Sequence, residues 1–202
     1  MILPIRCEYC SAPGAAVCTS CARDLPWANA GPPPENCDAV FTAFRLSAPV
    51  QAQIHALKYQ AQLRHARQLG ELMAHRLAAR PEPLPQVLMP VPLHRERLRR
   101  RGFNQSLEIA RAIERMLALH LWPRAARRTR NTEDQIGKSA VERRRNVRGA
   151  FALSQRLDGL HIALLDDVMT TGATLSELAK ACRDAGAERI EAWALAQAPL
   201  AD

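Results

Sequence analysis

Apolar residues recur at helical spacing in three stretches of this chain. Residues 50–79 carry apolar positions three and four residues apart, which predicts one long helix with Gly70 inside it. A second helix is predicted after Asn104, a capping residue, because apolar positions recur from there to Leu117. A third helix is predicted over residues 175–185, closed by Gly186.

Short, unbroken apolar runs lie between these helices and predict buried strands. They cover residues 87–91, 162–165 and 190–196. Strand, helix and strand in this order indicate a parallel α/β sheet flanked by helices. The run 162–165 ends at two adjacent acids, Asp166 and Asp167, and a polar turn follows.

Four of the six cysteines stand in two closely spaced pairs before this α/β region. Cys7-x-x-Cys10 and Cys18-x-x-Cys21 each present two sulfurs to one ion, so together they predict a structural Zn²⁺ site. Two disulfides or a redox pair are the alternatives. A reducing location disfavours the disulfides, and the doubled spacing favours metal over redox chemistry. Cys37 and Cys182 stand alone, and Cys182 suits a small buried position in a helix.

A glycine and three prolines follow the cysteine pairs and suggest a boundary. Residues 30–34 cannot form a helix or a central strand. We therefore expect a zinc-binding segment over residues 1–36 and a main domain over residues 37–202. No run of 18 apolar residues and no signal-peptide pattern occurs, so we expect no membrane insertion and a cytoplasmic location.

The composition is that of a globular protein, but the charge is unevenly distributed. Hydrophobic residues make up 48% and charged residues 24%, which excludes a wholly disordered chain, a collagen and a coiled coil. The net charge is +8, yet residues 91–156 alone hold 17 basic and 6 acidic residues. This concentration indicates a phosphate-bearing partner, either a nucleic acid or a metabolite; a solvated basic face is the alternative.

The segment after the central strand combines acids with a turn suited to phosphate. Hydroxyls and backbone N–H groups at a helix N-terminus form an anion site. A glycine there lets the ligand come close to the backbone. Carboxylates beside it suit a ligand that also carries sugar hydroxyls, and bound Mg²⁺ would offset the negative charge. A phosphorylated ribose meets both demands, whereas the plain alternative is an acidic strand end with an ordinary turn. The residues concerned are Asp166, Asp167, Val168, Met169, Thr170, Thr171, Gly172, Ala173 and Thr174.

This segment resembles the binding motif for 5-phosphoribosyl 1-diphosphate (PRPP) in type I phosphoribosyltransferases. The resemblance implies a phosphoribosyltransferase-like fold that binds PRPP with Mg²⁺. It also implies that Asp166 and Asp167 hold the ribose hydroxyls and that residues 170–174 surround the 5′-phosphate. Further segments, together with the cysteine pairs, resemble the ComF family of competence proteins: residues 57–59, 91–105, 128–135 and 145–151. That family implies a role in natural transformation, acting on single-stranded DNA beside a helicase partner.

Cationic residues follow the strand at 87–91 and are candidates for the diphosphate side of the ligand. His94, Arg95 and Arg97 would lie at the ligand edge of the sheet, where Arg95 could neutralise a leaving diphosphate. His94 can equally be a plain loop residue. The row at residues 99–101 suits surface contact with a nucleic-acid backbone. Residues 132–145 are either a lid over PRPP or simply a mobile loop.

Two functions therefore remain open from the sequence, which does not decide whether the chain is an enzyme. The first is a ComF-like protein of DNA uptake that binds PRPP and single-stranded DNA. The second is an active phosphoribosyltransferase of nucleotide salvage or related metabolism that releases diphosphate from PRPP. A zinc-stabilised scaffold with an inert pocket is a third interpretation, and no acceptor site stands out.

Overall fold

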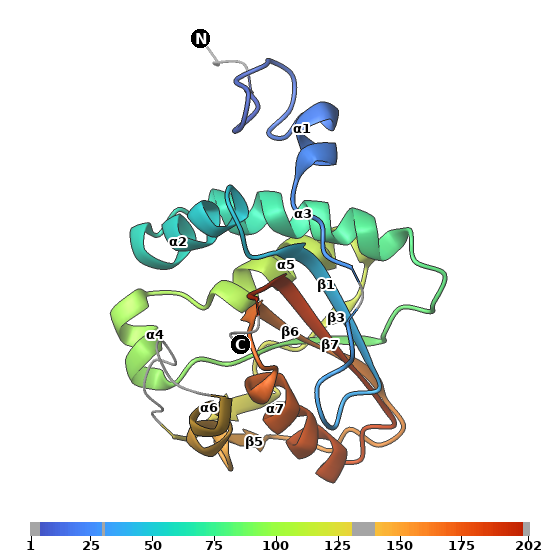
Figure 1. The fold of residues 1–202 in the computed structure, drawn as a ribbon. Coiled ribbons are helices and arrows are strands. Elements are labelled where there is room, and N and C mark those ends of the chain that lie inside the picture. Colours follow the sequence, from blue (N-terminus) through green and yellow to red (C-terminus); the bar gives the residue numbers. More distant parts are fainter. Residues whose placement is uncertain (1–4, 30, 131–139, 200–202) are drawn as a thin grey trace.

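The computed structural model describes residues 5–29, 31–130 and 140–199. Figure 1 shows a central sheet with helices on both sides and the cysteine-rich segment beside α3. The elements in chain order are α1 (Thr19–Asp24), β1 (Ala39–Arg45), α2 (Val50–Gln60), α3 (Arg64–Ala78), β2 (Val87–Pro90), α4 (Arg95–Arg101), α5 (Gln105–Leu117), β3 (His120–Leu121), β4 (Ala126–Arg128), α6 (Ala140–Val147), β5 (Phe151–Leu153), β6 (His161–Met169), α7 (Ala173–Asp184) and β7 (Arg189–Gln197).

Five strands form one parallel sheet in the order β1-β7-β6-β2-β3. β4 and β5 pair separately as an antiparallel ribbon. The carboxyl ends of all five parallel strands meet at one edge, which is where open α/β sheets bind ligands. The predicted class, a parallel sheet flanked by helices behind a small cysteine-rich segment, is confirmed.

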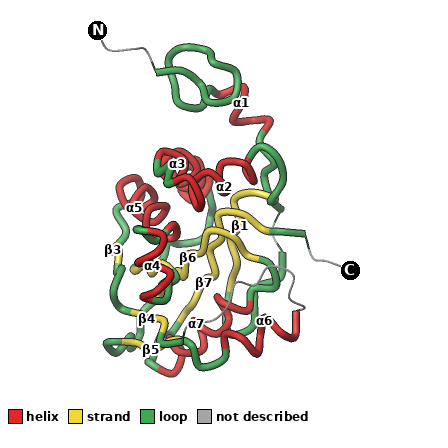
Figure 2. The backbone as a smooth tube through the Cα atoms, turned by 90° about the vertical axis from the view of Figure 1, so that its left-hand side faces the viewer, coloured by secondary structure: helices red, strands yellow, loops and turns green. Residues whose placement is uncertain are grey.

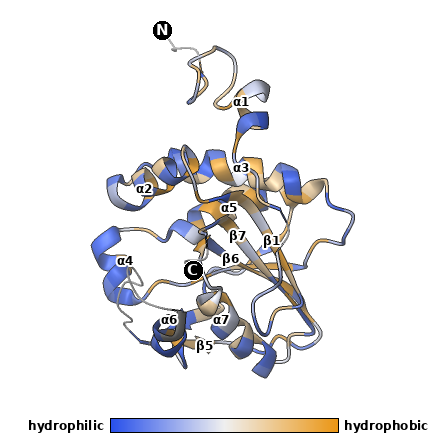
Figure 3. Ribbon diagram, viewed as in Figure 1, coloured by the Kyte–Doolittle hydropathy of each residue, from blue (hydrophilic) through white to orange (hydrophobic). Residues whose placement is uncertain are grey.

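The sheet separates two hydrophobic cores. Figure 2 shows the three layers of the domain, with helices on either side of the strands. One core joins α2, α3 and α5 to the sheet and includes the fully buried Trp193. The other lies under α7, where Leu178 and Cys182 are fully buried, as expected for Cys182. Figure 3 shows hydrophobic colour on the strands. Strands of a parallel sheet are covered on both faces, so their sequences are unbroken apolar runs.

Gly70 marks a close contact between two helices rather than a break. A Cβ at Gly70 would lie 2.8 Å from the Cβ of Ala112 and 3.0 Å from the backbone oxygen of Ile109. Glycine therefore lets α3 pack directly against α5.

The helix expected over residues 50–79 is wrong as a single element, because α2 ends at Gln60 and α3 begins at Arg64. Ala61 adopts a left-handed conformation with φ of 52°, and its N–H donates to the oxygen of Ala56, which closes α2. No glycine or proline announces this break.

The predicted end of the central strand also needs correction. β6 does not stop at Leu165 but runs through both acids to Met169, because its pairing with β7 continues to Gln197. The following helix begins at Ala173, two residues before the predicted start. Strand β1 and helix α4 were not anticipated at all.

The proposed lid falls partly outside the described residues. Residues 132–139 are not described, and residues 140–145 belong to α6. Among the described helices, none combines the length and the apolar character that crossing a membrane requires.

Candidate functional site

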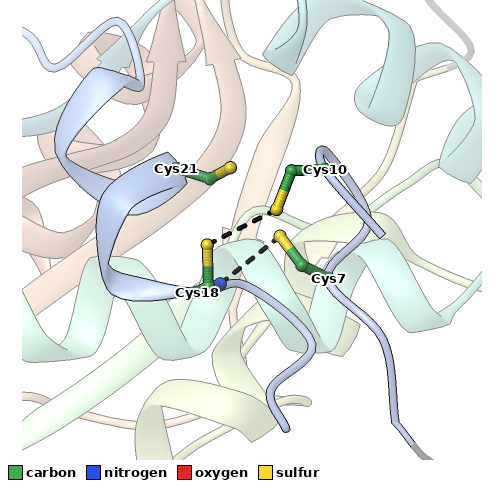
Figure 4. A group of neighbouring side chains, drawn as sticks. All are labelled: Cys7, Cys10, Cys18 and Cys21. Carbon is green, nitrogen blue, oxygen red and sulfur yellow. Dashed lines mark hydrogen bonds between the residues drawn. The ribbon is translucent and has the colours of Figure 1, made fainter. Parts of the chain in front are cut away.

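Four cysteines converge in the N-terminal segment, as Figure 4 shows. The sulfurs of Cys7, Cys10, Cys18 and Cys21 all lie within 4.8 Å of one another, and the Sγ atoms of Cys10 and Cys18 are 3.7 Å apart. A tetrahedral zinc site with Zn–S bonds of about 2.3 Å has sulfur–sulfur edges of about 3.8 Å. All four cysteines are free thiols, so the disulfide alternative is not realised here.

The backbone around these cysteines favours a thiolate. The N–H of Cys18 donates to Sγ of Cys7 over 3.4 Å. This hydrogen bond lowers the pKa of Cys7 to about 6, although burial opposes it. Hydrogen bonds with the neighbouring sulfurs, Cys10 first, raise the pKa of Cys21, because its thiol is the donor and these bonds favour the protonated form. The donor set and its spacing fit a structural metal ion.

The cysteine-rich segment is attached to the main sheet domain through specific contacts. The hydroxyl of Tyr9 donates to Oε1 of Gln53 on α2 over 2.6 Å. Trp27 stacks on Phe44 of β1 with ring centroids 4.6 Å apart. The division between residues 36 and 37 remains a prediction.

At the edge of the sheet where ligands bind, the two acids of β6 contact different partners. Oδ1 of Asp166 accepts from the hydroxyl of Ser106 at 3.0 Å and from the N–H of Asp167 at 2.9 Å. Ser106 is held at the start of α5 because Asn104 caps that helix, accepting from the N–H of Ser106 at 3.1 Å. The Asp166 carboxylate is thus fixed in position by a second element.

Asp167 forms an ion pair that the site prediction missed. Nζ of Lys58, near the end of α2, lies 2.7 Å from Oδ2 of Asp167. The side chains are 21% and 6% exposed, so the pair is shielded from water. The only sequence signal for Lys58 was its place in the segment 57–59, which carries part of the family resemblance.

The two neighbouring carboxyl groups have opposite pKa shifts. Burial, and then the charge of Asp167, raise the pKa of Asp166 to about 7. Burial also disfavours the charged form of Asp167, but the charge and hydrogen bond of Lys58 outweigh it and hold the pKa of Asp167 below its ordinary value. The pair therefore carries about one negative charge below neutral pH and approaches two above it.

The turn after β6 leads directly into α7. Gly172 is the N-cap residue of α7 with φ of 73°, a conformation that glycine adopts without strain. A hollow of about 30 Å³ lies between this turn and Asp166; its lining includes Thr170, Gly172 and Thr174, but not Asp167. Seven of the nine predicted residues 166–174 line this hollow, whereas Asp167 pairs with Lys58 and Thr171 lines another hollow.

Proline 34 packs against the outer side of this turn. A Cβ at Gly172 would come within 2.8 Å of Cγ of Pro34, so residue 172 must be small. Asn36 donates to the hydroxyl of Ser176 on α7 over 3.3 Å. The segment expected to form the boundary between the two parts of the chain therefore supports the turn.

The three diphosphate-side candidates have different surroundings. His94 caps α4, its Nδ1 accepting from the N–H of Glu96 at 3.4 Å, and Arg95 is exposed on that helix. Arg97 alone lines a cavity of about 340 Å³ next to the acid pair. The other lining residues are Lys58, Tyr59, Ala61, Arg100, Arg101 and Phe103.

Among the described residues that line this cationic cavity, four are basic and none is acidic. The guanidinium of Arg101 lies over the ring of Tyr59, 5.7 Å from its centroid, and its charge helps to lower the pKa of Asp167. Arg101 is half-buried rather than a plain surface cation, whereas Arg99 is exposed. The expectation that residues 99–101 all lie on the surface therefore holds for Arg99 and Arg100 but not for Arg101.

A second cationic hollow of about 320 Å³ lies between α6 and α7, on the other side of the turn. Arg144, Arg145 and Arg148 line it from α6 and the loop after it, and Lys180 lines it from α7. Two acids, Glu35 and Glu177, line it as well. Thr171 borders this hollow, and its buried hydroxyl has no hydrogen-bond partner within the described part of the chain.

No family model matches this chain. It is 37% identical over 157 residues to competence protein F of Haemophilus influenzae, covering 74% of this chain and 69% of that protein. It is 33% identical over 193 residues to the DNA utilization protein YhgH of Escherichia coli K12, covering 94% of this chain and 82% of that protein.

The chain therefore belongs to the ComF family of competence and DNA utilization proteins, which confirms the resemblance seen in the sequence. Among solved structures, it is similar to the glutamine PRPP amidotransferase of Bacillus subtilis, with 18% identity and a TM-score of 0.44. That match covers 64% of this chain and about a quarter, 26%, of the amidotransferase.

Proposed function

We propose that this protein acts in DNA uptake, binds PRPP or a related phosphoribosyl ligand at the edge of its sheet, and binds single-stranded DNA on a cationic face. The observation that carries the ligand proposal is the continuity of the acid pair with the glycine turn at the start of α7. The names of the two relatives, competence protein F and DNA utilization protein, support the role in DNA uptake.

Each part of PRPP has a counterpart in this site. Backbone N–H groups at residues 170–174 suit the 5′-phosphate, since the first N–H groups of a helix lack intrahelical partners. Carboxylate oxygens of Asp166 and Asp167 accept hydrogen bonds from the ribose hydroxyls. The cationic cavity, which Lys58 lines beside its ion pair with Asp167, suits the diphosphate. Bound Mg²⁺ would supply positive charge to the diphosphate oxygens, and carboxylates are ligands that it prefers.

The cysteine site has a structural part in this proposal. A Zn²⁺ ion held by Cys7, Cys10, Cys18 and Cys21 would fix the small segment, which has few buried apolar side chains of its own. The contact between Tyr9 and Gln53 would then link this segment to α2, the helix that carries Lys58.

Isothermal calorimetry tests the ligand proposal. Zinc-loaded protein is titrated with PRPP and Mg²⁺, beside the double variant Asp166→Ala, Asp167→Ala. We expect binding to the wild-type chain and its loss in the variant. Absence of binding to the wild-type protein would contradict the proposal. Release of diphosphate in the presence of added nucleobases would favour an active transferase.

The α6–α7 hollow is the face that we propose for DNA. Its lining holds four cations against two acids, and three of the cations are exposed arginines, which suit phosphate contacts. We expect Arg144→Gln, Arg145→Gln and Arg148→Gln together to reduce the slope of log affinity for oligo(dT) against log salt by about 2. Arg111→Gln with Arg115→Gln, on the exposed side of α5, is the matched control and should leave this slope unchanged.

An unchanged slope in the triple variant would exclude this face as the DNA site. The helicase partner implied by the family resemblance stays a prediction. Co-purification of a helicase with the tagged protein from its own host tests it directly.

A further inference from the structure

Lys58 occupies one of the carboxylate oxygens of the acid pair, Oδ2 of Asp167. Oδ1 of Asp166 already accepts two hydrogen bonds, from Ser106 and from the N–H of Asp167. Oδ2 of Asp167 is the oxygen paired with Nζ of Lys58 at 2.7 Å. A ribose hydroxyl that binds Asp167 at this oxygen must therefore compete with an ammonium group.

The same lysine also lines the cationic cavity. Lys58 lies two residues before the end of α2, and its side chain contributes to the 340 Å³ hollow together with Arg97, Arg100 and Arg101. Its four-carbon stem ends in an ammonium that rotates among three staggered positions at each bond. Nζ can thus exchange a carboxylate on one side for a phosphate oxygen on the other.

We propose that Lys58 determines ligand specificity by transferring its ion pair from Asp167 to the ligand's diphosphate when a ribose hydroxyl binds Asp167. The inference rests on the proposed binding of a phosphoribosyl ligand. It adds a means of selecting PRPP over ribose 5-phosphate, which has the same sugar hydroxyls and 5′-phosphate but no diphosphate.

The selection follows from where the displaced charge goes. With PRPP, the ammonium leaves one anion and reaches another, and the ribose hydroxyl donates a hydrogen bond to the carboxylate that it leaves. With ribose 5-phosphate, the ammonium either stays on Asp167 and blocks the hydroxyl, or moves into a cavity that already holds three guanidinium groups. The lysine therefore weakens binding of the shorter ligand and strengthens binding of the longer one.

Removal of the ammonium should change the two affinities in opposite directions. Calorimetry of Lys58→Met with Mg²⁺ should show PRPP binding about tenfold weaker, as expected for loss of one charge-assisted hydrogen bond. Ribose 5-phosphate should bind about threefold tighter or more, because Asp167 is released. Arg100→Met, which removes a cavity cation not paired with Asp167, is the control and should weaken PRPP without strengthening ribose 5-phosphate.

If Lys58→Met weakens ribose 5-phosphate binding or leaves it unchanged, the inference is wrong while the proposed function stands. If the wild-type protein binds neither ligand, the proposed function and the inference are both wrong. Equal affinity of the wild-type protein for both ligands would also overturn the inference.

A second measurement uses the wild-type chain and does not depend on the folding of a variant. The chain has only three lysines, Lys58, Lys138 and Lys180, so ¹⁵N-lysine labelling gives three ammonium signals. Lys138→Arg and Lys180→Arg assign them by elimination. PRPP should shift the Lys58 signal strongly, and a Lys58 signal unmoved at saturating PRPP would contradict the transfer.

Discussion

Replacing Asp166 by asparagine should stabilise the fold, and more so at alkaline than at acidic pH. The pKa of Asp166 is raised from its ordinary value of 3.8 to about 7, mainly by burial and then by the charge of Asp167. In the folded protein it therefore keeps its proton up to about pH 7, whereas in the unfolded chain it loses that proton near pH 4. The stability that the protonated form contributes is present at low pH and is lost as the pH rises from about 4 to about 7.

The size of this effect follows from the shift. About three pKa units correspond to at most about 4 kcal/mol of unfolding free energy at pH 8. The asparagine has no proton to lose there, and its side chain can still pair with the hydroxyl of Ser106. Asp166→Asn should thus gain about 1 to 4 kcal/mol over the wild-type protein at pH 8 and much less at pH 5.

Urea unfolding at pH 5, 7 and 8 measures this difference. The zinc site contributes equally to both proteins at each pH, so it cancels in the comparison. The same variant should bind PRPP more weakly, because a carboxylate oxygen is lost. A stability difference that does not change with pH, or a variant less stable at pH 8, would refute the reasoning about Asp166.

Three further outcomes test other parts of the structure. Gly70→Val should cost about 1 to 3 kcal/mol in urea unfolding, because its Cβ would meet Ala112 of α5 at 2.8 Å. Glu191→Gln should lower the unfolding free energy by about 3 kcal/mol or more. The buried Glu191 pairs with Arg80 at 2.6 Å, and its loss leaves that guanidinium without an anionic partner. An unchanged urea midpoint would contradict this. Cys10→Ser should abolish stoichiometric zinc by atomic absorption and expose residues 5–29 to proteolysis, and retention of zinc would count against the four-cysteine site.

Much of the candidate site could be predicted because its information is local. The cysteine pairs form turns within a few residues, and the segment 166–174 forms one strand, one turn and one helix start. In both cases the spacing of the residues determines their geometry. The buried strands were also found, since a parallel sheet buried on both faces produces unbroken apolar runs.

Contacts between distant segments were not predictable in this way. Lys58 meets Asp167 only because α2 lies over the carboxyl end of β6, and nothing in the spacing of residues 57–59 indicates that partner. The support of Gly172 by Pro34 is a contact of the same kind. Such pairs depend on the order of strands in the sheet, which a single sequence does not reveal.

Two local predictions failed for other reasons. The break between α2 and α3 depends on a left-handed Ala61, a conformation that alanine rarely adopts, so no turn signal marked it. Helix α4 was overlooked because its seven residues are nearly all charged and show no apolar period.

The most direct test of the ligand site is ³¹P NMR of PRPP, whose three phosphorus atoms give separate signals. With Mg²⁺ and the wild-type protein, we predict that the 5′-phosphate signal shifts on binding to residues 170–174. In Thr170→Val with Thr171→Val, which removes two hydroxyls from that turn, this shift should shrink markedly. A 5′-phosphate signal that the wild-type protein leaves unmoved, or that both proteins shift equally, would contradict the account.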